Sequence, residues 1–249
     1  MPKGYILTKS KYIRGLQCEK AMYLDVYKPK LAFYSPETLA KFKEGRLFEK
    51  TFKETFPNGI DISARLRYRM DDYPVLTADL LRRPGETAIF EAGFLYNEVL
   101  VLADVVHKHE DGSIDIYEVK NSNAVSSTFR NDIGIQNYVI QHALQAIQPD
   151  DLFCNGLTLN HFYLLYNNGE GGFVKEDLLE HAQAACDGIE QNVARFKQVL
   201  HAEEPLMPMS EQCDTPYECP YKRYCKRLKP KSPCPAFPKG LHRRPASGD

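Results

Sequence analysis

The chain has 249 residues, of which 43% are hydrophobic and 26% are charged, so it can bury a substantial core and is not expected to be disordered. A formal net charge of -1 excludes a uniformly basic nucleic-acid coat, and no apolar run reaches the roughly 18 residues of a membrane span. The first residues also lack the apolar stretch of a secretory signal. We therefore expect a cytoplasmic protein with no membrane partner.

Two helices are predicted near the N-terminus. Residues 8–24 carry apolar side chains at helical spacing, and Cys18 falls inside this segment. The second helix is expected to begin with Ser35 as N-cap and Pro36 as first helical residue, and to end at Pro57-Asn58-Gly59. Its aromatic stripe predicts a buried face.

The middle of the chain changes to short runs of β-forming residues. Turn signals at Asn97 and Asp111-Gly112 separate three of them, which predicts an antiparallel meander. Apolar spacing then predicts a helix that ends before Pro149, one further strand, and a long amphipathic helix. The predicted strands are 87–95, 98–107, 113–120 and 157–166, and the long helix is 176–200. This order predicts an α/β fold with a mixed sheet flanked by helices.

Three parts are expected along the sequence. Residues 1–203 form the core, including the N-terminal helix that supplies Cys18, and residues 204–228 form a cysteine module. Residues 229–249 form a basic, proline-rich tail, which we expect to be disordered.

The candidate chemistry begins at Asp104, a carboxylate within the apolar run 99–106. Burying such a group is costly unless a cation pairs with it. Glu118 and Lys120 lie two residues apart on the next strand, so they share one face. A tight turn at Asp111-Gly112 would set Asp104 opposite Val119, one position away. A longer turn or a bulge is therefore needed for the two carboxylates to meet.

Oxygen ligands of this kind suit Mg²⁺ or Mn²⁺, which Asp104, Glu118 and the Val119 carbonyl would hold. Lys120 would then orient the attacking water or offset developing negative charge. The alternative is a structural ion pair between Lys120 and one of the acids.

Two outlying positions extend this set. Gly45 and Glu49 lie about one helical turn apart, so the glycine would allow a close approach and the glutamate would reach the metal. Glu49 could instead lie on a solvated helix edge. Gln136 occupies an apolar helix face, where it would contact either substrate phosphate or the backbone.

Cysteines provide a second signal. Cys18 stands near the start and Cys213, Cys219 and Cys225 near the end, in a C-x5-C-x5-C run. Seven cysteines, an odd number, in a reducing compartment favour thiols or ligands over disulfides. The wide spacing favours a [4Fe-4S] cluster over zinc. Cys154 and Cys186 are expected to be ordinary buried thiols. Cys234 could substitute as a ligand, but Pro233 and Pro235 flank it, and we expect it to be free.

Together, Gly45-x-x-x-Glu49, Asp104, Glu118-Val119-Lys120 and Gln136 resemble the PD-(D/E)xK nuclease superfamily in its RecB-like branch. The cysteine set is similar to that of its iron-sulfur members, which include the AddB nuclease domain and the RecB-like exonucleases of CRISPR adaptation. The resemblance implies a restriction-endonuclease-like core of helix, three-stranded meander, helix and strand. It implies catalytic roles for Asp104, Glu118, Lys120 and Gln136, and a metal ligand at Glu49.

We therefore expect a metal-dependent DNA nuclease, an enzyme that hydrolyses phosphodiester bonds on single strands or ends, with a helicase, integrase or other protein as possible partner. A non-catalytic nucleic-acid-binding or scaffolding subunit with the same fold is the first alternative. A redox protein that uses the cluster is the second, and the lack of a second cofactor motif disfavours it.

Overall fold

The computed structural model describes residues 4–66, 69–147, 156–184 and 186–228. Its centre is a mixed sheet of seven strands in the order β2-β3-β4-β5-β6-β7, with β1 paired to β4 off this path. The strands are β1 Leu7–Thr8, β2 Ile60–Asp61, β3 Thr87–Tyr96, β4 Val99–Lys108, β5 Ser113–Lys120, β6 Thr158–Asn167 and β7 Phe173–Asp177. The predicted α/β class and mixed sheet are confirmed.

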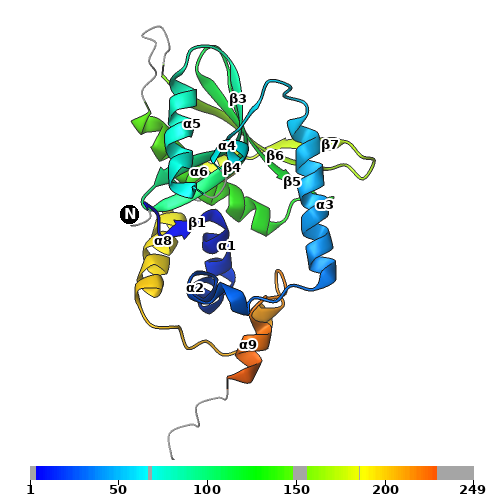
Figure 1. Ribbon diagram of the computed structural model, residues 1–249, viewed down its shortest axis with the longest axis vertical. Helices are drawn as coiled ribbons and strands as arrows, with labels where there is room; N and C mark the ends of the chain where they lie inside the picture. Colours follow the sequence, from blue (N-terminus) through cyan, green and yellow to red (C-terminus); the bar gives the residue numbers. More distant parts are fainter. Residues whose placement is uncertain (1–3, 67–68, 148–155, 185, 229–249) are drawn as a thin grey trace, which may run out of the picture.

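Helices cover this sheet and extend beyond it (Figure 1). They are α1 Lys9–Gln17, α2 Glu19–Tyr27, α3 Pro36–Lys53, α4 Ile62–Leu66, α5 Tyr73–Arg82, α6 Ser127–Ala146, α7 Leu179–Ala184, α8 Cys186–His201 and α9 Lys222–Arg227. Short 3-10 turns occupy Pro29–Leu31, Met70–Asp72 and Glu211–Cys213. Among the described residues, none of these helices has the length and apolar character needed to cross a bilayer.

The two hairpins set the register of the central strands. Asn97 and Glu98 both have positive φ angles, 47° and 57°, as a two-residue type I′ turn requires. The next hairpin is longer than the tight turn predicted at Asp111-Gly112, because the backbone pairs His109 with Ser113 and leaves three loop residues between them. Gly112 supplies the left-handed residue of this loop, at φ 86°.

This longer turn corrects the predicted register by one residue. Val105 pairs with Tyr117, which aligns Asp104 with Glu118 rather than with Val119. The two carboxylates therefore belong to the same face at the point where regular pairing between β4 and β5 ends.

The two faces of the sheet are covered differently. The larger apolar cluster joins the sheet to side chains of α1, α5, α6 and α8. A smaller aromatic cluster places Phe52 of α3 against Phe90 and Tyr117 of the other face. The helix α3 has the expected N-cap, since Ser35 Oγ accepts a hydrogen bond from the Thr38 N–H.

The predicted burial of the α3 stripe is only partly correct. Phe52 is buried, but Phe42 and Leu47 nearer the N-terminus are 46% and 65% exposed. In Figure 1 this part of α3 runs beyond the sheet toward the end of the molecule that holds α2 and α9. There it has no sheet to pack against.

Other helix boundaries also differ from the predictions. The segment 8–24 is two helices, because Cys18 adopts an extended conformation between α1 and α2. The segment 176–200 begins with the end of β7 and continues as α7 and α8. The predicted tail, Cys154 and Cys234 lie outside the described residues, as does the side chain of Cys186. The proposed division at residues 203 and 228 stays a prediction.

Candidate metal centre

The candidate centre lies where one edge of β4 is divided between two partner strands. β1 pairs with the start of β4 at Val99 and Leu100, whereas β5 pairs with its end from Val105 onward. Asp104 lies between these pairings, and its Oδ2 accepts a hydrogen bond from the Val119 N–H at 2.7 Å. At this fork the side chain of Asp104, rather than the backbone of β4, pairs with the backbone of β5.

Three carboxylates from three elements meet at this fork. Glu49 of α3, Glu91 of β3 and Asp104 of β4 each offer an oxygen atom, and the three atoms lie within 4.8 Å of one another. All three residues are partly buried. Such a set of oxygen donors suits a divalent cation of the Mg²⁺ or Mn²⁺ type.

The backbone of Glu91 is strained at this position. Its φ angle is 56°, in the left-handed region that non-glycine residues seldom adopt. The neighbouring pairs, Phe90 with Val105 and Ala92 with Ala103, keep the regular register, so only Glu91 departs from the ladder. Strain of this kind is concentrated at functional sites, and here it places a carboxylate beside Asp104.

Lys53 forms ion pairs with two of these three carboxylates. Its Nζ lies 2.5 Å from Glu49 Oε1 and 2.8 Å from Glu91 Oε1. Burial lowers the pKa of Lys53, but Glu91 and Glu49 outweigh that effect and raise it above its ordinary value. The ammonium group is therefore charged, and it offsets part of the repulsion between the two glutamates.

Glu118 is the centre of a second, adjoining group. Lys9 Nζ donates to both carboxylate oxygens at 2.9 and 3.0 Å, and Lys120 Nζ lies 2.5 Å from Oε1. Gln136 Nε2 donates to Oε2 at 2.8 Å. Burial raises the pKa of Glu118, but Lys120 and Lys9 outweigh it and lower the pKa to about 2. Glu118 is therefore ionised.

Lys120 connects this group to α6. Its Nζ also lies 2.8 Å from Asp132 Oδ2, so one ammonium bridges two buried acids. Gln136 is fully buried, and its Oε1 has no hydrogen-bond partner among the described residues. An unpaired buried carbonyl oxygen is costly, which indicates that a donor from outside the chain, such as a water molecule, belongs beside it.

Asp104 responds most strongly to this environment. Burial raises the pKa of its carboxyl group, and the neighbouring Glu118 charge raises it further, to about 8. The whole centre holds more negative than positive charge when every acid is ionised. It comprises five carboxylates, Glu49, Glu91, Asp104, Glu118 and Asp132, and three ammonium groups, Lys9, Lys53 and Lys120. The excess of two negative charges equals the charge of one divalent cation.

The predicted site residues thus lie close together, but the group of three carboxylates contains Glu91 in place of Glu118. Glu49 and Asp104 lie beside Glu91. The carboxylate of Glu118 instead forms ion pairs with two lysines and accepts a hydrogen bond from a glutamine. The metal-ligand roles of Glu118 and of the Val119 carbonyl stay predictions. The close approach expected at Gly45 is not present, because a side chain there would meet no atom within 4 Å.

Sequence reasoning missed four residues of the centre: Lys9, Lys53, Glu91 and Asp132. Glu91 carried a usable signal, because it interrupts the apolar run 88–94 in the way that Asp104 interrupts its own strand. Lys9 carried none, because only the short pairing of β1 with β4 brings the start of α1 to Glu118.

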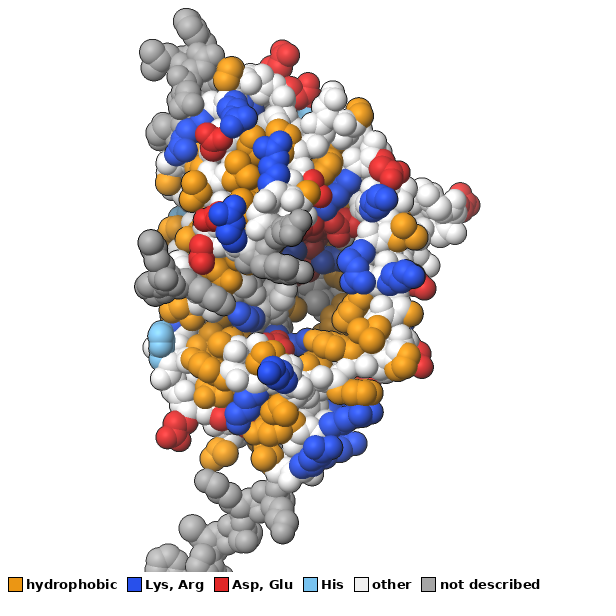
Figure 2. All heavy atoms as spheres, viewed as in Figure 1, with side chains coloured by type: hydrophobic (Ala, Val, Ile, Leu, Met, Phe, Trp, Pro, Cys, Tyr) orange, Lys and Arg blue, Asp and Glu red, His pale blue; other side chains and the backbone are white. Residues whose placement is uncertain are grey.

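The surface beside the centre is hollowed and charged. Figure 2 shows a hollow next to α3, with acidic side chains gathered at its upper edge and Lys and Arg side chains on the α3 side. The exposed basic residues of α3 are Lys41, Lys43, Arg46 and Lys50. They give α3 a local positive potential despite the near-neutral chain.

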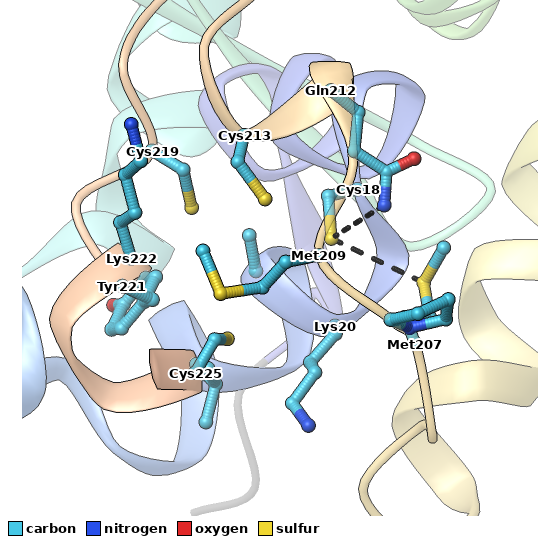
Figure 3. A pocket seen from close by; sticks show the side chains of 13 residues that line it. Cys18, Lys20, Met207, Met209, Gln212, Cys213, Cys219, Tyr221, Lys222 and Cys225 are labelled. Carbon is cyan, nitrogen blue, oxygen red and sulfur yellow. Dashed lines mark hydrogen bonds between the residues drawn. The ribbon is translucent and has the colours of Figure 1, made fainter. Parts of the chain in front are cut away.

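All four predicted cluster cysteines line one pocket (Figure 3). Cys18 comes from the break between α1 and α2, Cys213 from a 3-10 turn, Cys219 from the following loop and Cys225 from α9. Burial raises the pKa of the Cys219 and Cys225 thiols. Apolar side chains, among them Met207 and Met209, complete the wall.

Polar contacts tie this cysteine pocket to the N-terminal helices. Gln17 Nε2 donates to the carbonyls of Gln212 and Tyr217, at 2.9 and 2.6 Å. The Tyr221 hydroxyl donates to Asp25 Oδ1 at 2.6 Å. The two ends of the sequence therefore form one unit around the thiols.

Among the described residues, at least some thiols of the pocket lie further apart than the ligands of a bound zinc ion would. Tetrahedral zinc-thiolate bonds of about 2.3 Å would bring the sulfur atoms to about 3.8 Å from one another. Of the described residues, however, no three cysteines offer sulfur atoms that all lie within 4.8 Å. Lys20 and Lys222 also line the pocket, and their positive charge suits an anionic thiolate-ligated group.

No known family model matches the chain, and no curated protein is significantly similar to it. The residues and their geometry therefore carry the functional argument alone.

Proposed function

We propose that the protein is a divalent-metal-dependent nuclease with a restriction-endonuclease-like core, which hydrolyses phosphodiester bonds of DNA on single strands or ends. The observation that carries this proposal is the convergence of Glu49, Glu91 and Asp104 beside the Glu118–Lys120 pair. A structural ion pair would need one acid for each lysine, but this centre contains two acids in excess. The excess is explained if the resting protein holds a cation there.

The proposed ion is Mg²⁺ or Mn²⁺, held by Glu49, Glu91 and Asp104. When bound, such an ion polarises a phosphodiester and lowers the pKa of a coordinated water. Asp104 would give up its proton on binding, since the ion replaces it as the partner of the buried carboxylate. The affinity of the site for the ion is therefore expected to depend on the ionisation of Asp104.

Other residues of the centre position the reacting groups. Glu118 and Asp132 hold the Lys120 ammonium between them, so it is fixed at the edge of the site where negative charge develops during hydrolysis. Lys9 completes the neutralisation of Glu118. The unpaired Gln136 Oε1 is in place to accept a hydrogen bond from a water molecule next to Glu118.

We propose a structural [4Fe-4S] cluster ligated by Cys18, Cys213, Cys219 and Cys225. The sulfur spacing, the lysines in the wall and the burial of Cys213 and Cys219 support this assignment. The cluster would stabilise the fold by joining the two ends of the chain, since metal binding to separated segments contributes directly to folding.

The substrate is expected to follow the basic side of α3 toward the centre. Phosphates would be attracted to Lys41, Lys43, Arg46 and Lys50, in a salt-dependent manner. Exposed aromatic groups nearby suit unpaired bases, as Phe42 on α3 and Phe33 under Arg223 illustrate. This combination favours a single strand over an intact duplex.

The test is a cleavage assay on labelled single-stranded and duplex DNA with Mg²⁺ or Mn²⁺, using anaerobically purified protein. We expect Glu49→Gln, Asp104→Asn and Lys120→Ala to lower the rate at least a hundredfold. Glu44→Gln on the exposed side of α3 is the matched control for Glu49 and should retain the wild-type rate.

If wild type and the three site variants gave the same trace, the nuclease proposal would be rejected in favour of a nucleic-acid-binding or scaffolding subunit. RNA cleavage without DNA cleavage would reassign the substrate and leave the chemistry unchanged. A colourless preparation that holds zinc would overturn the cluster assignment.

A further inference from the structure

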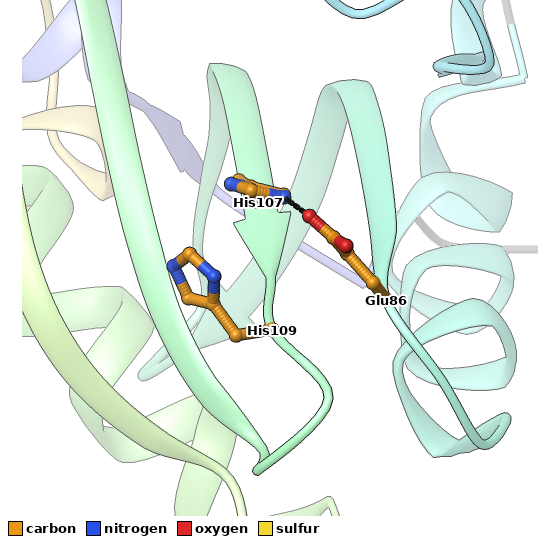
Figure 4. A group of neighbouring side chains, drawn as sticks. All are labelled: Glu86, His107 and His109. Carbon is orange, nitrogen blue, oxygen red and sulfur yellow. Dashed lines mark hydrogen bonds and ion pairs between the residues drawn. The ribbon is translucent and has the colours of Figure 1, made fainter.

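A second group of potential metal ligands lies near the other end of β4. Glu86, just before β3, and His107 and His109, on and just after β4, each offer one atom, and the three atoms lie within 4.8 Å of one another. Figure 4 shows the two imidazoles and the carboxylate on neighbouring strands. Two-residue spacing puts both histidines on one side of the chain, and Glu86 lies beside them, just before the neighbouring strand β3.

The position of this group separates it from the carboxylate centre. His107 and His109 follow Asp104 by three and five residues, so they are about 10 and 17 Å further along the strand. Odd spacing also puts them on the opposite face from Asp104. Phe56, which follows α3 in the chain, packs on this face. Its ring centroid lies 5.3 Å from that of His107.

The surrounding contacts already hold the imidazoles in place. His109 Nε2 lies 3.1 Å from Asp115 Oδ2, and Asn160 Nδ2 donates to the other oxygen of Asp115 at 3.2 Å. Metal-binding histidines commonly donate one ring N–H to a carboxylate in this way, which leaves the other nitrogen with its lone pair for an ion. His107 Nε2 is 2.6 Å from Glu86 Oε1, so its ring is oriented as well.

We propose that Glu86, His107 and His109 form a binding site for a borderline transition-metal ion of the Zn²⁺ class. Imidazole nitrogen suits Zn²⁺, Co²⁺ or Ni²⁺ far better than Mg²⁺, so the ligand chemistry distinguishes this site from the all-oxygen centre. Three protein ligands leave a coordination position for water or another exogenous ligand. Glu86 is exposed and His109 is partly exposed, so an ion has access from solvent.

The competing explanation is a plain pair of ionic contacts, His107 with Glu86 and His109 with Asp115. That explanation accounts for each contact separately. It does not require the three residues to converge, yet Glu86, His107 and His109 each offer a ligand atom within 4.8 Å of the other two. A shared cation accounts for this convergence, because all three atoms would then be its ligands.

The test is Zn²⁺ titration of the protein with its cysteine pocket loaded and with Mg²⁺ in excess, which occupies the oxygen site. The wild type should bind one more Zn²⁺ per chain than the His107→Gln/His109→Gln double variant. Zn²⁺ should also raise the unfolding temperature of the wild type and not that of the double variant. Asp115→Asn should weaken binding about tenfold, because it removes the group that orients His109.

His161→Gln is the matched control, since His161 pairs with Asp177 on a neighbouring strand and does not belong to the group. With Co²⁺ in place of Zn²⁺, the site should give the visible bands of a nitrogen and oxygen environment without sulfur charge-transfer absorption. Equal Zn²⁺ content in wild type and double variant would overturn the proposal, as would an equal loss in His161→Gln. A normal unfolding temperature of the metal-free double variant establishes that the variant is folded.

Discussion

Asp104 illustrates how one buried carboxylate can be chemically prepared by its neighbours. Burial and the Glu118 charge hold its pKa at about 8, so the acid keeps its proton at neutral pH unless a stronger cation displaces it. Glu118 itself stays ionised because two lysines lower its pKa to about 2. Two acids of adjacent strands thus have opposite protonation states.

This difference predicts a pH-dependent stability of the metal-free protein. The folded-state pKa of Asp104 lies above its unfolded value of 3.8, so the native state retains a proton that the unfolded state releases. The contribution of Asp104 to stability should therefore be fully present below about pH 4 and be lost as the pH rises to about 8.

The measurement is thermal unfolding of wild type and Asp104→Asn between pH 5 and 8. Asparagine can still accept the hydrogen bond from the Val119 N–H, and it does not ionise. The unfolding temperature of the variant should therefore rise relative to that of the wild type as the pH increases. Mg²⁺ should close this gap by stabilising only the wild type. A constant difference across the range would contradict the assigned ionisation.

Substitution of Glu91 should weaken metal binding without lowering the stability of the metal-free protein. Glu91→Asn removes a carboxylate whose burial raises its pKa, and asparagine tolerates the left-handed backbone better than glutamate. We expect the metal-free variant to unfold at the same temperature as the wild type or higher, and to bind Mn²⁺ at least tenfold more weakly. Unchanged Mn²⁺ affinity would remove Glu91 from the site.

At this scale the sequence predicted the acids that interrupt apolar strands and the Glu118-x-Lys120 pair. Glu49 and Gln136 were also placed near the centre by motif. Two of the four missed residues are lysines, whose long side chains can reach a buried acid from almost any surface position. Their partners become visible only when the strand register is known.

Among the elements, α1 has the most direct structural role between the two candidate sites. It begins at Lys9, which contacts Glu118, and ends next to Cys18, which lines the cysteine pocket. Nine residues span about 13 Å of helix. Its position is fixed laterally by α8, since the ring of Tyr12 contacts that of Phe196.

Gly15 lies where α1 packs tightly against its surroundings. A methyl group at this position would lie 2.8 Å from the Phe196 ring and 2.9 Å from the Met22 sulfur. Gly15→Ala should therefore destabilise the protein by about 1–3 kcal/mol through overpacking. Chemical denaturation measures the change.

Gly188→Ala in α8 is the control, because a methyl group there meets no atom within 4 Å. It should stabilise the protein by about 0.5–1 kcal/mol, the ordinary gain of alanine over glycine in a helix. Equal effects of the two substitutions would argue against tight packing between α1 and α8.

Periodicity predicted the long strands β3 to β6 and the helices α3 and α6 well, because each carries a full apolar pattern. It failed where a short element depends on a distant partner. The strands β1 and β2 each have two residues and exist through pairing with β4 and β3. The break at Cys18 also has no local signal, since no glycine or proline marks it.

At the scale of the whole molecule, the cysteine pocket and the metal centre are connected through α1. Removing the proposed cluster should release Cys18 and allow α1 to move, which would weaken the Lys9–Glu118 contact. We expect faster amide hydrogen exchange in α1 after anaerobic chelator treatment, with α5 unchanged. Equal protection of α1 in both forms would show that the pocket does not support the centre.

The fold class and the cysteine set were predictable from the sequence, but the placement of α3 relative to the sheet was not. The sequence indicated an α/β sheet and a cysteine set joining both ends, and the structure brings those four residues to one pocket. It did not indicate that α3 would extend past the sheet, because its aromatic stripe is continuous over exposed and buried parts alike.

The most direct test of the central claim is a crystal structure of the protein with Mn²⁺, using the anomalous signal of the metal. We expect a peak in contact with the carboxylates of Glu49, Glu91 and Asp104, with Lys53 displaced from at least one glutamate. Absence of a peak at these three side chains, in crystals that show Mn²⁺ bound elsewhere, would contradict it.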